Sequence, residues 1–309
     1  MSHNRIDTHQ HLIPRAYRTL LDDRGLTAGG WPTPDWDVAT AIDLMDRESI
    51  ATGILSLSAP GVHFGDDAEA RTLARQVNDY AAELVKNRPD RFGQFACLPL
   101  PDVDGAITEA VYALDELDAD GVVLLSNAQG RYLGDPSYEP LWTELDTRSA
   151  VVFIHPTEPP IAMLDGMPSP LIDYPFDTTR TAVHMVVNGV MNRHTRLKVI
   201  LSHGGGFLPY AAYRFLGAAQ FNPGTTTETI MTDMRRFYFD TALTSTPSAM
   251  PSLLAFADPT RITYGSDFPF APSGHLFNVA LDNTPLDDNL RYAINRGNAE
   301  TLFPRLANP

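Results

Sequence analysis

Eight short apolar runs rich in β-branched residues recur along the chain, and longer segments with helical spacing separate them. Continuous apolar runs are typical of parallel strands that are buried on both faces. Strands that alternate with helices favour an α/β barrel, and 309 residues suit one such domain. We therefore expect a (β/α)8 TIM barrel that spans residues 1–309 as a single domain. The expected strands are residues 5–9, 51–58, 91–99, 121–127, 151–156, 197–204, 236–243 and 262–269.

Two segments exceed what a minimal barrel needs. Residues 24–37 follow the first expected strand, and residues 157–177 follow the fifth. Both are rich in Pro and Gly, which indicates loops. Both also leave the carboxyl end of a strand, the face on which barrel active sites lie, so we expect them to cover a pocket.

The helical segments show amphipathic spacing. In residues 66–90 the apolar positions expected on one face are Leu73, Val77, Tyr80, Leu84 and Val85. Asp66 and Asp67 suit the first turn of this helix, and a proline follows its end.

The net charge, the apolar stretches and the cysteine content limit the partners and the cellular compartment that we expect. The net charge of −15 argues against a nucleic acid or an anionic membrane as partner. The chain begins without the apolar run of a signal peptide, and no apolar stretch is long enough to cross a bilayer. The only cysteine, Cys97, cannot form an internal disulfide, which fits a reducing compartment. We expect a soluble cytoplasmic protein with a small-molecule substrate.

Histidines and an aspartate stand at the ends of four expected strands. His9 and His11 end the first strand, His155 the fifth, His203 the sixth and Asp267 the eighth. Residues i and i+2 of a strand point the same way, so His9 and His11 present both imidazoles to one side. Three imidazoles and a carboxylate suit Zn²⁺ or another borderline divalent cation. We interpret His9, His11, His155 and Asp267 as metal ligands and His203 as an acid/base group beside them.

Each of these motifs also has an ordinary structural interpretation. An H-x-H pair alone is a weak signal, because most histidines are satisfied surface or core residues. "SHGGGF" could be only a tight turn, and "GSDFP" only a loop cap. The joint occurrence of all the motifs at strand ends favours the metal site. His63, which follows the second strand, is a further candidate for substrate contact.

The motifs "DTHQH", "VVFIHP", "VILSHGGGFLP" and "YGSDFPF" resemble those of the amidohydrolase-related metal-dependent decarboxylases. That group includes aminocarboxymuconate semialdehyde, γ-resorcylate and 6-methylsalicylate decarboxylases. The resemblance covers nearly the whole chain, and residues 54–102 look closest to the 6-methylsalicylate branch. It implies a distorted barrel of the amidohydrolase superfamily, one Zn²⁺ (Mn²⁺ in some relatives), catalytic roles for His203 and Asp267, and a homodimer or dimer-based oligomer.

The same resemblance suggests how a substrate is held. In the muconate branch an arginine eleven residues after the "HGGG" histidine reaches the pocket of a neighbouring subunit, and Arg214 has that spacing here. The arginine that precedes the "WD" pair in that branch is missing, although Trp31 and Trp36 are present. This departure favours an aromatic monocarboxylate over a dicarboxylate. Arg214, Trp31, His63 and Phe270 are therefore the candidate substrate-binding residues.

The leading hypothesis is non-oxidative decarboxylation of an ortho-hydroxybenzoate-like acid, with Asp267 as proton donor to the ring. The γ-resorcylate branch has a glutamate where this chain has Gly206, so a proton relay through it is not available here. Two other enzyme classes stay open: a metal-dependent hydrolase of a lactone, ester or amide, and a hydratase. The remaining alternative is a barrel whose metal is structural or whose site has decayed.

Overall fold

The computed structural model describes residues 4–271 and 274–307, and eight parallel strands form the centre of the molecule. They lie in the order β1-β2-β3-β4-β7-β8-β9-β10, the order of a (β/α)8 barrel. Each of the eight expected strands is confirmed, although most are shorter than expected. Their bounds are Arg5–His11 (β1), Ile50–Ser56 (β2), Phe92–Cys97 (β3), Gly121–Leu125 (β4), Val151–His155 (β7), Lys198–Leu201 (β8), Tyr238–Asp240 (β9) and Ile262–Thr263 (β10).

The barrel closes between β1 and the segment that follows β10. Asp7 and Gln10 form parallel bridges to Tyr264 and Phe268 in that segment. The Asp267 amide donates to the carbonyl of His9 over 2.8 Å, which places these two chain-distant residues side by side. Closure is therefore made by bridges beyond the two-residue strand β10, and the barrel is distorted at this seam.

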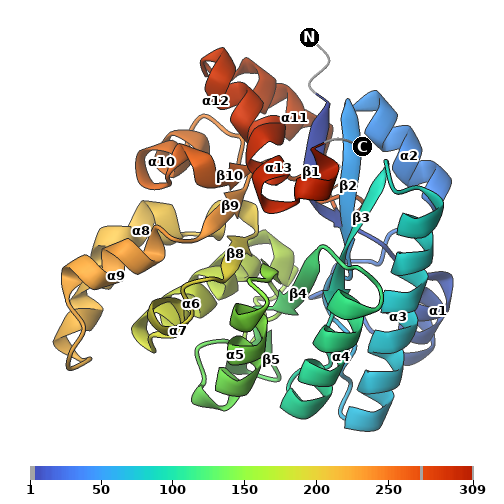
Figure 1. The fold of residues 1–309 in the computed structure, drawn as a ribbon, viewed down its shortest axis with the longest axis horizontal. Coiled ribbons are helices and arrows are strands. Elements are labelled where there is room, and N and C mark those ends of the chain that lie inside the picture. Colours follow the sequence, from blue (N-terminus) through green and yellow to red (C-terminus); the bar gives the residue numbers. More distant parts are fainter. Residues whose placement is uncertain (1–3, 272–273, 308–309) are drawn as a thin grey trace.

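Helices surround the strands, as Figure 1 shows, and most of them follow a strand of the barrel. The two ends of the described chain meet at one side of the barrel, where the Arg296 guanidinium donates to the carbonyl of Asn4. The helices are Arg15–Arg24 (α1), Val38–Arg47 (α2), Asp67–Asn87 (α3), Val103–Asp115 (α4), Glu139–Thr147 (α5), Asp173–Val187 (α6), Val190–Arg193 (α7), Leu208–Phe215 (α8), Thr227–Met234 (α9), Ala249–Phe256 (α10), Gly274–Asn283 (α11), Asp288–Tyr292 (α12) and Asn298–Leu302 (α13).

Alternate side chains of each strand enter two different parts of the core. Val122 and Leu124 of β4 join the outer cluster beneath the helices, whereas Val123 joins a second cluster with Phe95 and Phe153. This alternation is what a pleated strand buried on both faces requires, and it explains the continuous apolar runs in the sequence.

The long helix α3 begins where the sequence predicts, with Asp66 as its N-cap accepting from the amide of Glu69. The expected apolar face is only partly right. Leu73 and Val77 are buried, but Tyr80 is 38% exposed. Small residues such as Ala70, Ala74 and Ala81 complete the buried face, because they allow the helix to approach the barrel closely.

The segments expected to be loops differ from that expectation in one place. Residues 25–37 contain neither helix nor regular strand, but α6 begins at Asp173, inside the expected loop 157–177. A short hairpin of β5 (Asn127–Ala128) and β6 (Arg131–Tyr132) follows β4 and was not expected. Its tight turn depends on positive φ angles at Gln129 and Gly130, and Gly was the only sequence signal for it. Within the described ranges, no helix has the length and apolar character needed to span a membrane.

Asn78 of α3 connects this helix to the end of β3. Its side-chain amide donates to the Cys97 carbonyl over 3.0 Å and to Glu109 over 2.8 Å, and its oxygen accepts from the Cys97 amide over 2.9 Å. The side chain is buried, with 1% exposure. Its removal therefore leaves buried polar groups without partners.

We expect Asn78→Ala to lower the free energy of unfolding by about 2–3 kcal/mol, as measured by urea titration. The control is Asn87→Ala at the exposed end of the same helix, which should change that free energy by less than about 0.5 kcal/mol. Equal losses in both variants would contradict the role assigned to Asn78.

Candidate metal centre and active site

Four side chains converge at the carboxyl ends of the barrel strands. They come from β1, β7 and the segment after β10, and one ligand atom from each lies within 4.8 Å of the others. The members of this metal-ligand cluster are His9, His11, His155 and Asp267, all of them buried. The His9 and His11 Nε2 atoms are 3.1 Å apart, and Asp267 Oδ1 lies 3.3 and 3.2 Å from them. The strand-end pattern in the sequence therefore corresponds to one compact site.

Asp240, at the end of β9, fixes the orientation of side chains in this site through its hydrogen bonds. Its Oδ2 accepts a hydrogen bond from His9 Nδ1 over 2.7 Å, which leaves Nε2 of that ring directed at the cluster. Its Oδ1 accepts from the backbone amides of His203 and Ala242 over 2.9 and 3.0 Å. Asp240 has no exposed surface. One carboxylate thus positions a metal ligand and the backbone of the neighbouring histidine.

Asp7 fixes the other side of the cluster. Its carboxylate accepts from the amides of His9 and Ser266 over 3.0 Å each and from the Ser266 hydroxyl over 2.5 Å. Ser266 precedes Asp267, so this network holds the loop that presents the ligand carboxylate. Next to it, a Cβ placed on Gly265 would lie 2.8 Å from the Cβ of His9, which explains why a glycine stands in "YGSDF".

His203 stands at the edge of the cluster. Its Nε2 lies 3.4 Å from Asp267 Oδ2, and its ring centroid is 4.8 Å from that of His9. Both His203 and Asp267 have positive φ, 52° and 59°, a backbone conformation that side chains other than Gly rarely adopt. Such strain is typical of functional positions that the surrounding structure enforces.

Neighbouring charges shift the acid/base behaviour of the cluster. Burial alone would raise the pKa of Asp267, but the charge of His9 and hydrogen bonds from His11 and His203 hold that pKa well below its usual range. Burial would lower the pKa of His9, yet the carboxylates of Asp240 and Asp267 raise it to about 10. Asp267 is therefore a carboxylate at neutral pH, the form that binds a cation.

The other two imidazoles are neutral. Burial lowers the pKa of His155 well below its usual value, and the nearby His11, His9 and His203 act in the same direction. Burial also lowers the pKa of His11. Neutral imidazole is the form that ligates a metal, so a cation bound at the cluster would have to displace the proton that Asp240 and Asp267 favour on His9.

A cavity of about 170 Å³ opens directly onto the cluster. His155, His203 and Asp267 lie at its base, and Trp31, Leu171, Tyr174 and Phe270 are among its mostly apolar walls. A cavity of about 150 Å³ binds benzene in another protein, so this metal-site cavity suits one substituted ring. Its described lining contains no Lys or Arg. A carboxylate ligand would have to be neutralised by a cation at the cluster or by a group from outside this chain.

Curated relatives cover almost the whole chain. A protein named decarboxylase yanB from Aspergillus niger is 40% identical, and the match covers 99% of this chain and 89% of the relative. A 6-methylsalicylic acid decarboxylase from Penicillium expansum is 37% identical, with 98% of this chain and 97% of the relative covered.

The amidohydrolase family model Amidohydro_2 matches residues 6–305. The chain belongs to this amidohydrolase family. Among solved structures, an amidohydrolase II has a TM-score of 0.92 and 34% identity, with 97% of this chain and 99% of that chain covered. A dihydroxybenzoic acid decarboxylase from Polaromonas, solved with manganese and 2-nitroresorcinol, has a TM-score of 0.82 and 26% identity, with 99% and 98% covered. The predicted family and barrel are thereby confirmed.

The donor set of this amidohydrolase fits a divalent transition metal. Three buried imidazoles and one ionised carboxylate point to a common centre, and three of these ligands have an outer partner for the ring or the backbone. The cavity reaches the cluster from one side, as expected for a catalytic site that keeps an open coordination position.

The structure brings some predicted substrate residues of this amidohydrolase together and not others. Trp31 and Phe270 line the metal-site cavity, and Phe270 packs edge-to-face on His11 with ring centroids 5.5 Å apart. His63 lines a different cavity. Arg214 is exposed on α8 and does not line the metal-site cavity of its own chain.

Sequence reasoning missed the residues that position the ligands. Asp240 ends the strand "RFYFD", and a carboxylate at a strand end was a signal that could have identified it. Asp7 and Tyr174 gave no comparable signal, because their roles depend on contacts with residues far away in the chain. Burial raises the pKa of Asp7 to about 7, against hydrogen bonds from Ser266.

We expect Asp240→Asn to weaken metal binding by about 10–100-fold, because the amide cannot accept from His9 in the same way and orient its ring. Metal content after dialysis against a graded chelator series, measured by mass spectrometry, gives this value. Asp233→Asn, which changes a carboxylate of α9 remote from the cluster, is the control and should retain the metal as wild type does. Equal retention in both variants would refute the positioning role of Asp240.

Proposed function

We propose that this amidohydrolase is a metal-dependent carboxy-lyase that removes CO₂ from an ortho-hydroxybenzoate-type acid without oxidation. The observation on which the proposal depends is a single-ring apolar cavity that ends on a buried carboxylate and three imidazoles. Relatives at 37–40% identity are named as decarboxylases, one of them for 6-methylsalicylic acid, which supports the same reaction class.

We further propose Zn²⁺ as the bound cation and Mn²⁺ as the alternative. The histidine-rich ligand set favours Zn²⁺. The manganese in the Polaromonas decarboxylase supports the alternative. When bound by the metal-ligand cluster, the cation supplies positive charge that neutralises the substrate's carboxylate and adjacent hydroxyl oxygen.

The walls of the cavity hold the substrate ring and exclude water. Trp31 and Phe270 offer aromatic faces, and Leu171 and Tyr174 add apolar surface. Burial of a substituted ring against these side chains orients the carbon that bears the carboxylate towards Asp267.

Asp267 is the group that moves the proton. Because it is ionised at rest, it must accept a proton before it can donate one. The substrate's own ortho-hydroxyl is a source that balances the reaction. Asp267 then passes the proton to the ring carbon, the bond to the carboxylate breaks, CO₂ leaves, and the electron pair restores aromaticity. The phenolate that remains takes a proton from water, and His203, 3.4 Å from Asp267, orients the carboxylate during the transfer.

The test is turnover of 6-methylsalicylate and 2,6-dihydroxybenzoate by protein loaded with Zn²⁺ or Mn²⁺. We expect release of CO₂ and a phenol, with one deuterium at the vacated carbon when the reaction runs in heavy water. Asp267→Asn should reduce kcat by about 10²–10⁴-fold, the usual contribution of a general acid or base. Metal content of the variant is measured in parallel, so that loss of the metal is not mistaken for loss of the proton donor.

Two outcomes would contradict this function. Absence of turnover across a panel of hydroxybenzoates would refute the decarboxylase. Incorporation of ¹⁸O from water into an acid derived from a lactone or ester would instead identify a hydrolase.

We also propose that the chain forms a homodimer through the face of α8. We propose a cytoplasmic location as well, which accords with the single buried cysteine. Tyr210 and Tyr213 of this helix are 87% and 78% exposed, and Phe221 beyond it is 82% exposed. Large exposed aromatic side chains in one region are typical of protein interfaces. Arg214 lies between them and, within residues 4–271 and 274–307, its side chain makes no hydrogen bond or ion pair.

Sedimentation equilibrium should therefore give twice the chain mass of 34.0 kDa. Tyr213→Asp should shift the protein towards monomer, because a charge would be buried at the interface. If Arg214 of the partner subunit reaches the metal-site cavity, Arg214→Ala should lower kcat/KM while the dimer stays intact. A monomeric wild type with full activity would refute both the dimer and this role of Arg214.

A further inference from the structure

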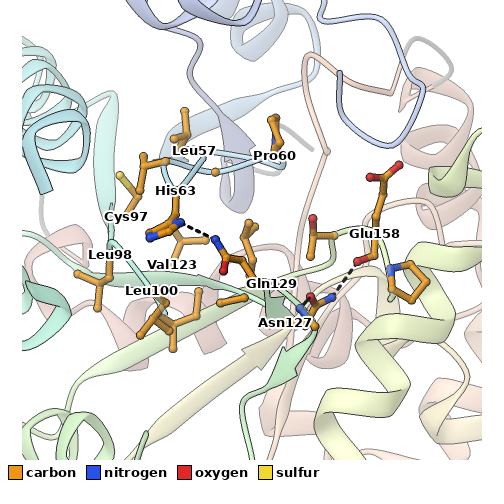
Figure 2. A pocket seen from close by; sticks show the side chains of 18 of the residues that line it. Leu57, Pro60, His63, Cys97, Leu98, Leu100, Val123, Asn127, Gln129 and Glu158 are labelled. Carbon is orange, nitrogen blue, oxygen red and sulfur yellow. Dashed lines mark hydrogen bonds between the residues drawn. The ribbon is translucent and has the colours of Figure 1, made fainter. Parts of the chain in front are cut away.

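A second cavity, of about 360 Å³, opens at the same face of the barrel as the metal-site cavity. Figure 2 shows its lining, with Cys97 and Leu98 on one side and Glu158 on the opposite side. It lies at the carboxyl ends of β2, β3, β4 and β7, and it shares no lining residue with the metal-site cavity. The second cavity is therefore distinct from the metal-site cavity.

One layer of side chains separates the two chambers. Leu125, at the end of β4, lines the second cavity and packs against a small apolar cluster that contains Ala59 and Tyr174. Tyr174 and Phe270, which also packs on this cluster, line the metal-site cavity. The second cavity thus adjoins the site of the proposed reaction.

The upper rim of the second cavity is held in place by paired polar groups. His63 Nδ1 accepts from the Gln129 side-chain amide over 2.8 Å and from the Gly65 backbone amide over 3.2 Å, so its Nε2 donates to Asp67 over 2.8 Å. Gln129 belongs to the tight turn between β5 and β6. Both ring nitrogens of His63 already form hydrogen bonds within the protein. A ligand in the cavity could therefore pack against the imidazole ring but not form a hydrogen bond with it.

The walls below this rim are formed mostly by apolar side chains, with Asn127, Thr157 and Glu158 as polar members of the lining. Burial raises the pKa of the Cys97 thiol, which keeps it neutral. Among the described residues of the lining, Glu158 carries the only carboxylate, and none is a Lys or Arg. In the part of the chain that the structure describes, this carboxylate has no hydrogen bond or ion pair. The apolar residues of the lining include Leu57, Val62, Leu98, Leu100, Val123, Leu124 and Leu125.

We propose that the second cavity binds a neutral phenol, the molecule that remains after the substrate has lost its carboxylate. The ring is buried against the leucine and valine side chains, and the phenolic O–H donates to the Glu158 carboxylate. A benzoate anion is rejected, because it meets the charge of Glu158 and finds no cation. This inference rests on the proposed function for the origin of the phenol, but the binding chemistry depends only on the cavity.

Loss of CO₂ therefore changes which of the two cavities is suited to the aromatic ring of the bound molecule. The substrate carries a negative charge that a cation held by the metal-ligand cluster would neutralise, and the lining of the second cavity offers no such cation. The product carries no charge and matches the apolar neighbour beyond Leu125. A phenol in this second site does not occupy the metal-site cavity, so the two sites can be filled independently.

The experiment is a ¹⁹F NMR titration of the full-length, metal-loaded protein with 3-fluorophenol. We expect saturable binding that excess benzoate does not displace. Ala128→Trp, at the half-buried rim of the cavity, should abolish this binding, whereas the matched variant Ala128→Ser should retain it. Glu158→Gln, an exposed substitution with little risk to folding, should weaken 3-fluorophenol binding by about tenfold and admit benzoate.

Displacement of 3-fluorophenol by benzoate, or unchanged binding in both Ala128→Trp and Glu158→Gln, would overturn the second site. The decarboxylase assay on the same preparation separates this inference from the proposed function. Turnover without binding in the second cavity would refute the cavity alone. Binding without turnover on any hydroxybenzoate would support the cavity and contradict the proposed function.

Discussion

The seam between β1 and the segment after β10 is the contact on which the site depends. Backbone hydrogen bonds across it bring His9 and His11 within reach of Asp267, although more than 250 residues separate them along the chain. The Asp7 carboxylate reinforces the same seam by binding the Ser266 amide and hydroxyl. Because the strand on one side of this seam is only two residues long, side-chain contacts supplement the ladder where the ligands must be most accurately placed.

Electrostatic interactions determine the protonation states of the side chains in the cluster. Burial would favour neutral groups throughout the cluster, yet opposed charges at close range outweigh it for Asp267 and His9. Asp267, the proposed proton donor, is therefore ionised in this structure, so the proposed reaction requires it to gain a proton before it can donate one. In the proposed reaction the same side chain alternates between the anion that binds a cation and the acid that protonates the ring.

Features that follow from local periodicity could be predicted from the sequence. Features that depend on contacts between residues far apart in the chain could not. All eight strands, and the four side chains that meet as candidate metal ligands, followed from apolar runs and the polar residues that end them. The start of α6 at Asp173 was missed because Pro and Gly nearby indicated a loop, while burial of the helix against the barrel prevailed. His63 lies at the active face as expected but lines the second cavity, since strand order alone does not show which side of Leu125 a loop residue will occupy.

The two contacts made by the Asp240 carboxylate have a consequence for how the site responds to damage. One carboxylate group restrains both an imidazole of the cluster and the backbone beneath His203. Damage that loosens this anchor cannot disturb one function and spare the other. A change at Asp240 should therefore release the His9 ring and the backbone of His203 together, so that the two histidines lose their alignment as a unit.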